Sequence, residues 1–518
     1  MNQGPDGAVT PTAAEFAELA ASRKVIPVRR SVLADGLTPV SVYRALAQER
    51  PGTFLLESAD QGKWARYSFI GVRSAAMLTE ANGEAVWVGR PPLGVPLQGS
   101  PADVLRDTVA ALATPADPSL PPFTSGMVGY VAYDAVRHWE GVPDNNPDEL
   151  KVPELGMLLA SDVAVVDHLN GTVLLVANAI NFDGSETGVA AAYADAVSRL
   201  DRMTADLAVA QPVPPAVFDA AAQPVITSRT DRDTYLAGVE EAREYIRAGD
   251  AFQIVLSQRF ESPCTASALD VYRVLRATNP SPYMYLVRLP ALTDPLMVGS
   301  VAFDVVGSSP EALVTVKDRR CLMHPIAGTR PRGETPERDN ELAEEMFADD
   351  KERAEHLMLV DLGRNDLGRV CAPGSVDVIQ FMAVEKYSHV VHLVSTVVGE
   401  VAPGRTAYDV LASTFPAGTL SGAPKPRAMA IIDELEPARR GVYAGAVGYL
   451  DFAGGLDTAI AIRTALIKDS VAYVQAGAGL VADSDPVRED QECRDKAAAV
   501  LRAVAMAQTM RTTSEPAK

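Results

Sequence analysis

Two pairs of glutamates stand at helical spacing in the second half of the chain, Glu352 with Glu355 and Glu489 with Glu492. Side chains three positions apart share one face of a helix. The first pair leads into an almost unbroken apolar run, residues 357–362, which predicts a buried helix whose carboxylates need partners. One such pair is usually a solvated face with ion pairs, but two pairs with anion-binding features between them indicate a metal or catalytic site. Mg²⁺ suits these oxygen ligands better than zinc and is usually completed by an anionic substrate.

Arg463 stands in a predicted strand of small and apolar residues, with Ala459, Ala461 and Ala465 on its own face. This arrangement leaves room for a ligand, and a guanidinium group suits a carboxylate or phosphate that it can bind through two hydrogen bonds. The alternative is a structural ion pair with an acid such as Asp457.

Glycine-rich segments follow several predicted strands. The run QAGAG, residues 475–479, has two glycines whose backbone N–H groups can converge on an anion, although the same pattern is a common tight turn. Residues 326–333 and 415–429 are further Gly-rich loops with hydroxyl groups and cations. Neither loop has Walker A or Rossmann spacing, so we expect no nucleotide.

The length, net charge and cysteine content of the chain limit the functions that it can have. A length of 518 residues predicts two domains, and a formal net charge of −20 argues against nucleic acid or an anionic membrane as the main partner. We expect a cytoplasmic protein, since no basic start with an apolar core and no 18-residue apolar run occurs. Four cysteines without C-x-x-C spacing fit a reducing cytoplasm rather than a zinc site or a disulfide scaffold: Cys264, Cys321, Cys371 and Cys493.

Composition and periodicity divide the chain into parts. Residues 1–20 and 511–518 are predicted to be flexible ends, and residues 21–207 show short β-rich runs mixed with helices. A Pro- and Ala-rich stretch without periodicity, residues 208–228, is the predicted linker. Residues 229–510 lack regular βαβ alternation, so the predicted fold class is α+β with large antiparallel sheets.

Long motifs between about residues 25 and 510 carry a family resemblance. They include LLES, NPSPYM, GSSPEALV, PIAGTRPRGET, EHLMLVDLGRNDLGRV, HLVSTVVGE, PAGTLSGAPKPRAM, IAIRTALI and QAGAGLVADSDP. On these motifs the chain resembles the chorismate-utilising enzymes, and among them the anthranilate synthase component I family. The resemblance implies antiparallel sheets in a sandwich flanked by helices, with two closely associated domains. It also implies Mg²⁺-dependent conversion of chorismate and ammonia to anthranilate and pyruvate, the first step of tryptophan biosynthesis.

The resemblance implies the roles of individual residues. Mg²⁺ would be held by Glu355 and Glu492, with Glu352 and Glu489 supporting it through water. Arg463, Tyr443 and the backbone of residues 477–479 would take the enolpyruvyl carboxylate. The whole substrate pocket would comprise Gly328, Thr329, Thr419, Tyr443, Arg463, Gly477, Ala478, Gly479 and Lys496.

Two further residues match the family's catalytic groups. Glu311 matches the acid that protonates the departing 4-hydroxyl group, a role that requires a neutral carboxyl group. His392 matches the active-site histidine, although a single histidine in a strand is usually structural.

Two positions separate the chain from other chorismate-utilising enzymes. Gln253 stands where isochorismate and salicylate synthases carry a lysine base for water, and Ala327 stands where aminodeoxychorismate synthases carry a lysine nucleophile. Neither residue can replace the lysine, which favours attack by ammonia over these alternative activities. The alternative to an enzyme is a non-catalytic regulatory protein that binds tryptophan. Such a protein would not need the glutamates and Arg463.

The resemblance also implies a source of ammonia and a regulatory site that both lie outside the catalytic pocket. No cysteine lies in the context of a glutaminase nucleophile, so the resemblance implies a separate glutamine amidotransferase subunit, in a heterotetramer with two of each chain. A ligand bound to two separated segments could set the domain geometry and switch the distant pocket. The residues that match the family's tryptophan feedback site are Glu57, Ser58, Pro280, Ser281, Pro282, Tyr283 and Met284.

Overall fold

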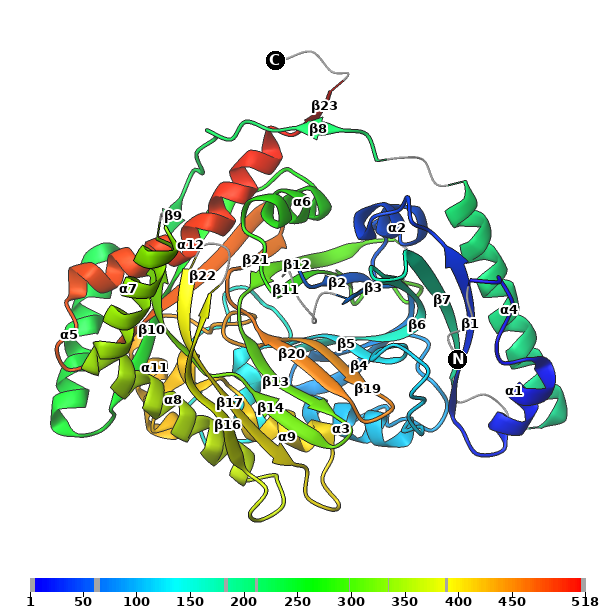
Figure 1. Cartoon of the computed structure of the whole chain (residues 1–518), viewed down its shortest axis with the longest axis horizontal. Coiled ribbons are helices and arrows are strands. Elements are labelled where there is room, and N and C mark those ends of the chain that lie inside the picture. Colours follow the sequence, from blue (N-terminus) through cyan, green and yellow to red (C-terminus); the bar gives the residue numbers. More distant parts are fainter. Residues whose placement is uncertain are drawn as a thin grey trace.

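Helices and strands alternate irregularly in the computed structural model, which describes residues 5–59, 66–180, 185–209, 213–297, 299–333, 335–386 and 390–513 (Figure 1). The first half contains α1 (Ala13–Ala20), β1 (Val25–Leu33), α2 (Pro39–Leu46), β2 (Thr53–Glu57), β3 (Tyr67–Ala81), β4 (Glu84–Gly89), α3 (Pro101–Ala111), β5 (Gly126–Val131), the 3-10 helix η2 (Tyr133–His138), β6 (Leu155–Asp167), β7 (Thr172–Ile180) and α4 (Glu186–Ala208).

The second half contains the elements that carry most of the predicted site. They are β8 (Ala216–Val217), β9 (Thr227–Ser228), α5 (Arg232–Ala248), β10 (Gln253–Pro263), α6 (Ala268–Thr278), β11 (Tyr283–Pro290), β12 (Val301–Ser309), β13 (Ala312–Lys317), β14 (Arg320–Met323), β15 (Ile326–Pro331), α7 (Pro336–Ala348), α8 (Asp350–Gly368), β16 (Asp377–Lys386), β17 (Val390–Glu400), α9 (Ala407–Thr414), α10 (Gly418–Ser421), β18 (Gly422–Ala423), α11 (Lys425–Leu435), β19 (Ala446–Asp451), β20 (Leu456–Ile460), β21 (Thr464–Lys468), β22 (Val471–Leu480), α12 (Pro486–Gln508) and β23 (Arg511–Thr512).

The strands form one continuous network, apart from the small pair of β8 and β23. Every strand pairing in the described ranges is antiparallel, which confirms the predicted α+β class with large antiparallel sheets. The network crosses between the two halves of the chain, because β2 pairs with β11 and β5 pairs with β19. No helix in the described part of the chain is both long and apolar enough to span a bilayer.

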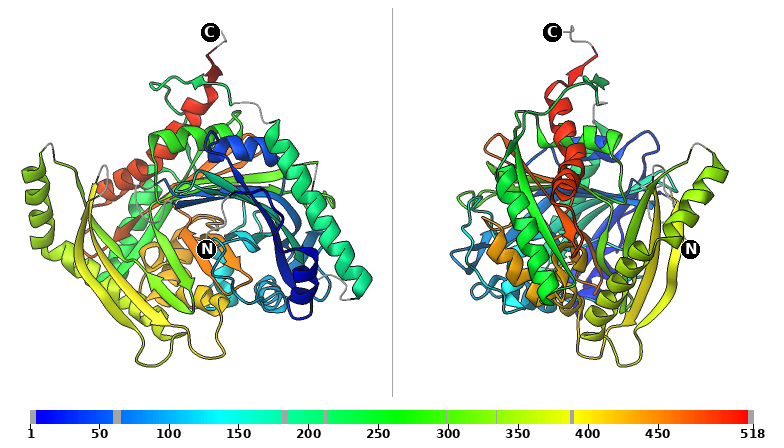
Figure 2. Two further views of the ribbon diagram at one scale, coloured as in Figure 1. Left: turned by 45° about the vertical axis from the view of Figure 1, so that its right-hand side comes forward. Right: turned by 90° about the vertical axis from the view of Figure 1, so that its left-hand side faces the viewer.

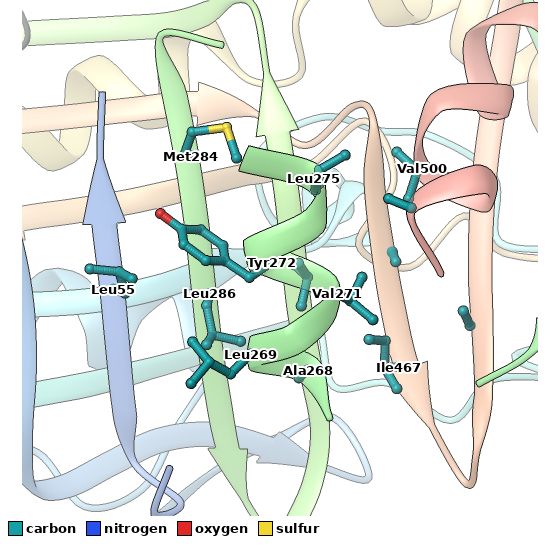
Figure 3. Packing of buried hydrophobic residues seen from close by; sticks show 14 of the residues in the cluster. Leu55, Ala268, Leu269, Val271, Tyr272, Leu275, Met284, Leu286, Ile467 and Val500 are labelled. Atoms are coloured by element: carbon teal, nitrogen blue, oxygen red, sulfur yellow. The ribbon is translucent and has the colours of Figure 1, made fainter. Parts of the chain in front are cut away.

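Helix α6 holds strand β11 in place. The helix begins after the N-cap residue Ser267 and stops before the NPSP segment, whose prolines cannot continue a helix. Its buried side chains Tyr272 and Leu275 pack beside Met284 and Leu286 of β11 (Figure 3). The apolar face of α6 therefore fixes the strand that follows the NPSP turn.

Helix α8 packs with α7 against strands β15 and β17 at one end of the molecule (Figure 2). Val360 and Leu367 are buried, but Leu357 is 47% exposed. Leu357, Asp361 and Arg364 follow one another at helical spacing, and all three face solvent. The prediction of a buried helix was therefore wrong, because the apolar run is interrupted on one face.

The predicted strand LDTAIAIRTALI is two strands in the structure. β20 ends at Ile460 and β21 begins at Thr464. Between them the Ile462 N–H donates to the Ile460 carbonyl (2.9 Å), and Arg463 has φ of +49°, in the left-handed region. The continuous strand was a wrong prediction, since a run of alanine and isoleucine does not reveal the break at residues 461–463. Arg463 therefore lies between two strands and not on the face of one.

Candidate active site

A cavity of about 600 Å³ opens between helix α12 and the break that contains Arg463. Arg463, Glu492 and Lys496 are the predicted site residues in its wall. The other lining residues are Asn279, Arg488, Gln491, Asp495 and Ala499. Three cationic side chains face two carboxylates here, so the cavity suits an anionic ligand although the whole chain is strongly negative.

The predicted alternative for Arg463, an ion pair with a structural acid such as Asp457, does not occur among the described residues. The Asp457 carboxylate accepts a hydrogen bond from Tyr283 Oη (3.0 Å), and no acidic side chain of the described residues forms an ion pair with Arg463. Burial lowers the pKa of Arg463, and the nearby Glu311 opposes that effect. Because arginine ordinarily titrates far above neutral pH, the guanidinium stays cationic. A half-buried cation that pairs with no acid among the described residues favours an anionic ligand.

Glu311 is held beside Thr419 at the wall of a smaller cavity. Thr419 Oγ1 donates to Glu311 Oε1 (3.1 Å), and the Ile460 N–H donates to the Glu311 carbonyl (3.0 Å). Burial raises the pKa of Glu311 to about 7. The Thr419 hydroxyl, Lys496 and Arg463 oppose this rise in pKa. A carboxyl group with this pKa is partly protonated at neutral pH, as a general acid requires.

The run at residues 475–479 lies inside β22 and pairs with β10, so it forms neither the predicted anion-binding nest nor a tight turn. The two glycines instead leave space for side chains from other parts of the chain. A Cβ atom at Gly477 would stand 2.7 Å from Tyr443 Oη, and one at Gly479 would stand 2.8 Å from Gln253 Nε2. Glycine at these two positions therefore lets Tyr443 and Gln253 reach the surface of the strand.

One edge of β22 is open beside the cavity. The ladder with β21 stops at Val474, and beyond it Lys496 Nζ donates to the Gly477 carbonyl (3.0 Å). Alternate residues of an antiparallel strand direct their backbone groups to the same edge. The amides of Gly477 and Gly479 consequently lie on the open edge, while the Ala478 backbone faces the opposite edge, toward β10.

One glutamate of each predicted pair lies near β22. Glu355 of α8 accepts a hydrogen bond from Gln253 Nε2 (3.1 Å), and Gln253 in turn lies against Gly479. Glu492 of α12 forms an ion pair with Lys496 (2.7 Å). Two acids from helices far apart in the sequence therefore flank the same strand.

The second glutamate of each pair is placed differently. Glu352 forms an ion pair with Arg330 of β15 (3.0 Å) and stands close to Gly328, where an added Cβ would be 3.2 Å from its Oε2 atom. Glu489 lies near Tyr235 and helps burial to raise the pKa of that phenol. Within the described ranges, no three His, Cys, Asp or Glu side chains are close enough together to hold a metal ion.

The chemistry of these side chains nevertheless fits Mg²⁺. The donors are carboxylate oxygens, and Gln253 Oε1 is a buried acceptor without a hydrogen-bond partner in the described structure. Magnesium takes oxygen ligands and needs only one or two carboxylates, because water and substrate complete its shell. The donor set does not suit zinc, for which cysteine and histidine are usual ligands.

His392 of β17 lies beside Gly328 of the neighbouring strand β15, where the pairing between the two strands is irregular. Its Nδ1 lies 2.8 Å from the Gly328 carbonyl, which can only accept, so Nδ1 carries the hydrogen and Nε2 the lone pair in the neutral ring. Burial lowers the pKa of His392, and Arg463 acts in the same direction. Thr329 lies opposite His392 in the ladder between the two strands. His392 is therefore neutral at neutral pH and able to accept a proton at Nε2.

The two segments predicted to bind tryptophan lie side by side. Strand β2 pairs with β11, with Glu57 opposite Met284, and the Ala59 N–H donates to the Ser281 carbonyl (3.1 Å). The structure thus brings the end of LLES next to the turn at residues 280–284, although more than 200 residues separate them in the sequence.

The polar side chains at this junction differ in whether they have hydrogen-bond partners. Glu57 Oε1 accepts from both Tyr272 Oη and Arg276 Nε, each at 2.5 Å. Ser58 Oγ is buried and has no hydrogen-bond partner in the described part of the chain. An unsatisfied buried hydroxyl group is costly, and a polar ligand would satisfy it.

Sequence reasoning missed a buried ion pair behind the cavity. Arg440 and Glu436 are 2% and 5% exposed, and their nearest atoms are 2.7 Å apart. Arg440 also donates to the carbonyls of Leu420 and Val255, both at 2.7 Å, and its guanidinium lies 5.5 Å from the Tyr443 ring centroid. The signal available in the sequence was the i,i+4 spacing of this Glu and Arg.

Comparisons with known proteins agree over nearly the whole chain. The chorismate binding enzyme family matches residues 25–502. Anthranilate synthase component 1 of Arthrobacter globiformis is 57% identical over 504 residues, which cover 96% of this chain and 93% of that protein. The protein of the same name from Mycobacterium tuberculosis is 54% identical over 511 residues, 98% of each chain.

Two solved structures are similar in fold. Anthranilate synthase component I from Streptococcus pneumoniae superimposes with a TM-score of 0.71 at 36% identity, covering 85% of this chain and 93% of that one. The menaquinone-specific isochorismate synthase of Escherichia coli has a TM-score of 0.67 at 19% identity, covering 96% of this chain and 99% of that one, and shares the fold alone.

The buried ion pair behind the cavity generates a prediction about stability. Arg440→Met leaves Glu436 buried without its cation and should lower the free energy of unfolding by about 3–5 kcal/mol, measured by urea denaturation. The double variant Arg440→Met, Glu436→Leu should recover most of that loss. Arg338→Met, which removes an exposed pair with Glu341, is the control and should cost less than about 1 kcal/mol. A double variant no more stable than Arg440→Met would contradict the assignment.

Proposed function

This chain belongs to the family of chorismate-binding enzymes, and from that premise we propose that it acts as anthranilate synthase component I. The reaction converts chorismate and ammonia to anthranilate, pyruvate and water. One observation carries the proposal: Glu311 is a half-buried acid with a pKa of about 7 that interacts with Arg463 and Lys496 of the cavity wall. Chorismate needs such a combination, since it has two carboxylates and a hydroxyl group that leaves only when protonated.

The substrate carboxylates are bound by different groups in this proposal. Arg463 and the open edge at Gly477 and Gly479 take the enolpyruvyl carboxylate, with Tyr443 beside them. Mg²⁺ would be held by Glu355 and Glu492, with Glu352 and Glu489 reached through water. When bound, the metal supplies positive charge to the ring carboxylate and relieves repulsion between the acids and the substrate.

The chemical steps use Glu311 and His392. Ammonia forms a bond to ring carbon 2, the double bonds shift, and the 4-hydroxyl group leaves as water with a proton from Glu311. The aminodeoxyisochorismate that results loses its carbon 2 proton and the enolpyruvyl group, which departs as pyruvate and leaves an aromatic ring. His392 would orient the intermediate or accept that proton, and the lone pair on its Nε2 supports this role.

Gln253 supports ammonia over water as the nucleophile. Its amide cannot remove a proton from water, and its Nε2 is engaged by Glu355. Ala327 likewise provides no amine that could attack the ring. These two residues disfavour the isochorismate, salicylate and aminodeoxychorismate synthases as alternatives.

We propose that a separate glutamine amidotransferase supplies the ammonia, in an assembly of two of each chain. All four cysteines are buried, and burial raises the pKa of Cys264 and brings that of Cys493 to about 12. The hydrogen bond with Cys321 lowers the pKa of Cys371, but both of these thiols are buried, with their sulfur atoms 3.8 Å apart. None of the four cysteines is therefore exposed to a substrate as a glutaminase nucleophile must be. Four free thiols also support a reducing compartment such as the cytoplasm.

We further propose that tryptophan binds between β2 and the turn at residues 280–284 and inhibits the enzyme. The unsatisfied hydroxyl group of Ser58 and the closeness of Ala59 to Ser281 support this location. A ligand there can alter activity only if it binds two arrangements of the chain with different affinity.

A product assay tests the proposed activity. The purified chain with chorismate, MgCl₂ and an ammonium salt should release anthranilate, detected by its blue fluorescence, and pyruvate in equal amounts. Omission of Mg²⁺ with added EDTA should abolish turnover. Isochorismate or aminodeoxychorismate as the accumulating product would contradict the proposal.

The pKa of Glu311 generates a prediction about pH. Because the group acts in its protonated form, kcat/KM should fall as pH rises through about 7. Thr419→Val removes a hydrogen bond that lowers the pKa of Glu311, so this limb of the profile should move to higher pH. Glu311→Gln should lower kcat at least about 100-fold. A Glu311→Gln chain that keeps more than a tenth of the activity would rule out the acid role.

A further inference from the structure

The backbone around Arg463 is held in a conformation that most residues avoid. A non-glycine residue in the left-handed region costs free energy and persists only where its surroundings fix it. Two hydrogen bonds from neighbouring residues do so here. Ser308 N–H donates to the Arg463 carbonyl (3.1 Å), and Thr464 Oγ1 donates to the Ile462 carbonyl (2.8 Å).

Both of these contacts lead to one segment, residues 279–285. Tyr285 Oη lies 2.6 Å from Thr464 Oγ1, and because that hydroxyl group donates to a carbonyl, Tyr285 donates to it. Ser308 Oγ donates to the Asn279 carbonyl (2.5 Å) and accepts from Asn279 Nδ2 (3.3 Å). The conformation of Arg463 is therefore fixed from two sides by the beginning of β11 and the residue before the NPSP prolines.

The contacts are rigid because they are buried. Tyr285 is 2% exposed and Ser308 is fully buried. The Tyr285 ring lies flat over Gly307, where an added Cβ would come within 2.2 Å of it. The side chains at these positions have no room to rotate. If β11 is displaced, Thr464 or Ser308 must therefore move with it.

The same segment also touches both ligand sites. Asn279 lines the large cavity together with Arg463 and Lys496. Five residues further along, Met284 stands opposite Glu57 in the ladder between β2 and β11. Residues 279–285 thus connect the cavity to the junction where Ser58 carries an unsatisfied hydroxyl group.

We propose that Tyr285, Ser308 and Thr464 are positioning residues that set the Arg463 guanidinium, and that a ligand at the 280–284 turn changes substrate affinity through them. The second part rests on the proposed function, because it takes tryptophan as that ligand. We call these three residues together with Asn279 the Arg463 clamp. A ligand that shifts β11 moves the clamp, and the clamp moves the guanidinium relative to the cavity.

The clamp should affect substrate affinity more than turnover. The carboxylate that Arg463 binds does not change its charge during the reaction, so its binding is similar in the ground state and the transition state. Loss of such uniform binding raises KM and leaves kcat unchanged. A residue that merely maintains the fold would lower both the amount of active enzyme and kcat.

Tyr285→Phe tests the clamp by removing one hydroxyl group and nothing else. With the full chain, Mg²⁺ and ammonium, KM for chorismate should rise about 3- to 10-fold, as expected for one buried hydrogen bond, with kcat within about twofold of wild type. Thr464→Val removes this hydrogen bond together with the one from Thr464 to the Ile462 carbonyl, so KM should rise at least as much as in Tyr285→Phe. Tyr130→Phe, which removes a buried phenol bound to the Pro153 carbonyl, is the matched control and should leave KM unchanged.

Tryptophan binding separates this inference from the proposed function. Equilibrium dialysis with labelled tryptophan, without chorismate, should give Tyr285→Phe the same affinity as wild type, while the factor by which tryptophan raises KM should fall at least about threefold. Wild-type KM and wild-type inhibition in both Tyr285→Phe and Thr464→Val would overturn the clamp alone. A wild-type chain that makes anthranilate but binds no tryptophan would overturn the feedback proposal, and with it the coupling.

Discussion

The left-handed backbone of Arg463 is the constraint on which the site depends. Arg463 directly precedes β21 in the break that follows β20, and it places a half-buried guanidinium group beside the cavity. Antiparallel pairing on both sides keeps this break in place, because β12 pairs with β21 and β13 with β20. The strained residue is thus held between two strands whose own pairings fix them, so its backbone cannot easily relax.

The position of Arg463 also determines the balance of charges around the cavity. Arg463 has no acidic partner in the described structure, whereas the acids of α8 and α12 are engaged by Gln253, Arg330 and Lys496. The cavity therefore suits an anionic ligand, although the protein carries a net charge of −20. Glu311 completes the balance, since burial keeps its carboxyl group partly neutral next to these cations.

The features that sequence predicted correctly depend on local chemistry or on long ordered motifs. The end of α6 follows from the fixed φ of proline, and the family and the antiparallel fold follow from motifs spread over the whole chain. The role of Gly477 and Gly479 could not be predicted, because their clearance is defined by Tyr443 and Gln253, which are distant in sequence. The break at Arg463 was missed for the same reason, since its stabilising contacts come from Ser308 and Tyr285.

The central claim is that Arg463 is the receptor for a substrate carboxylate, and chorismate binding without turnover tests it most directly. Titration calorimetry with Mg²⁺ present and ammonia absent should show that Arg463→Gln binds chorismate at least about 30-fold more weakly than wild type, as expected when a buried charged partner is removed. A dissociation constant within twofold of wild type would contradict the claim, because the carboxylate would then be bound elsewhere.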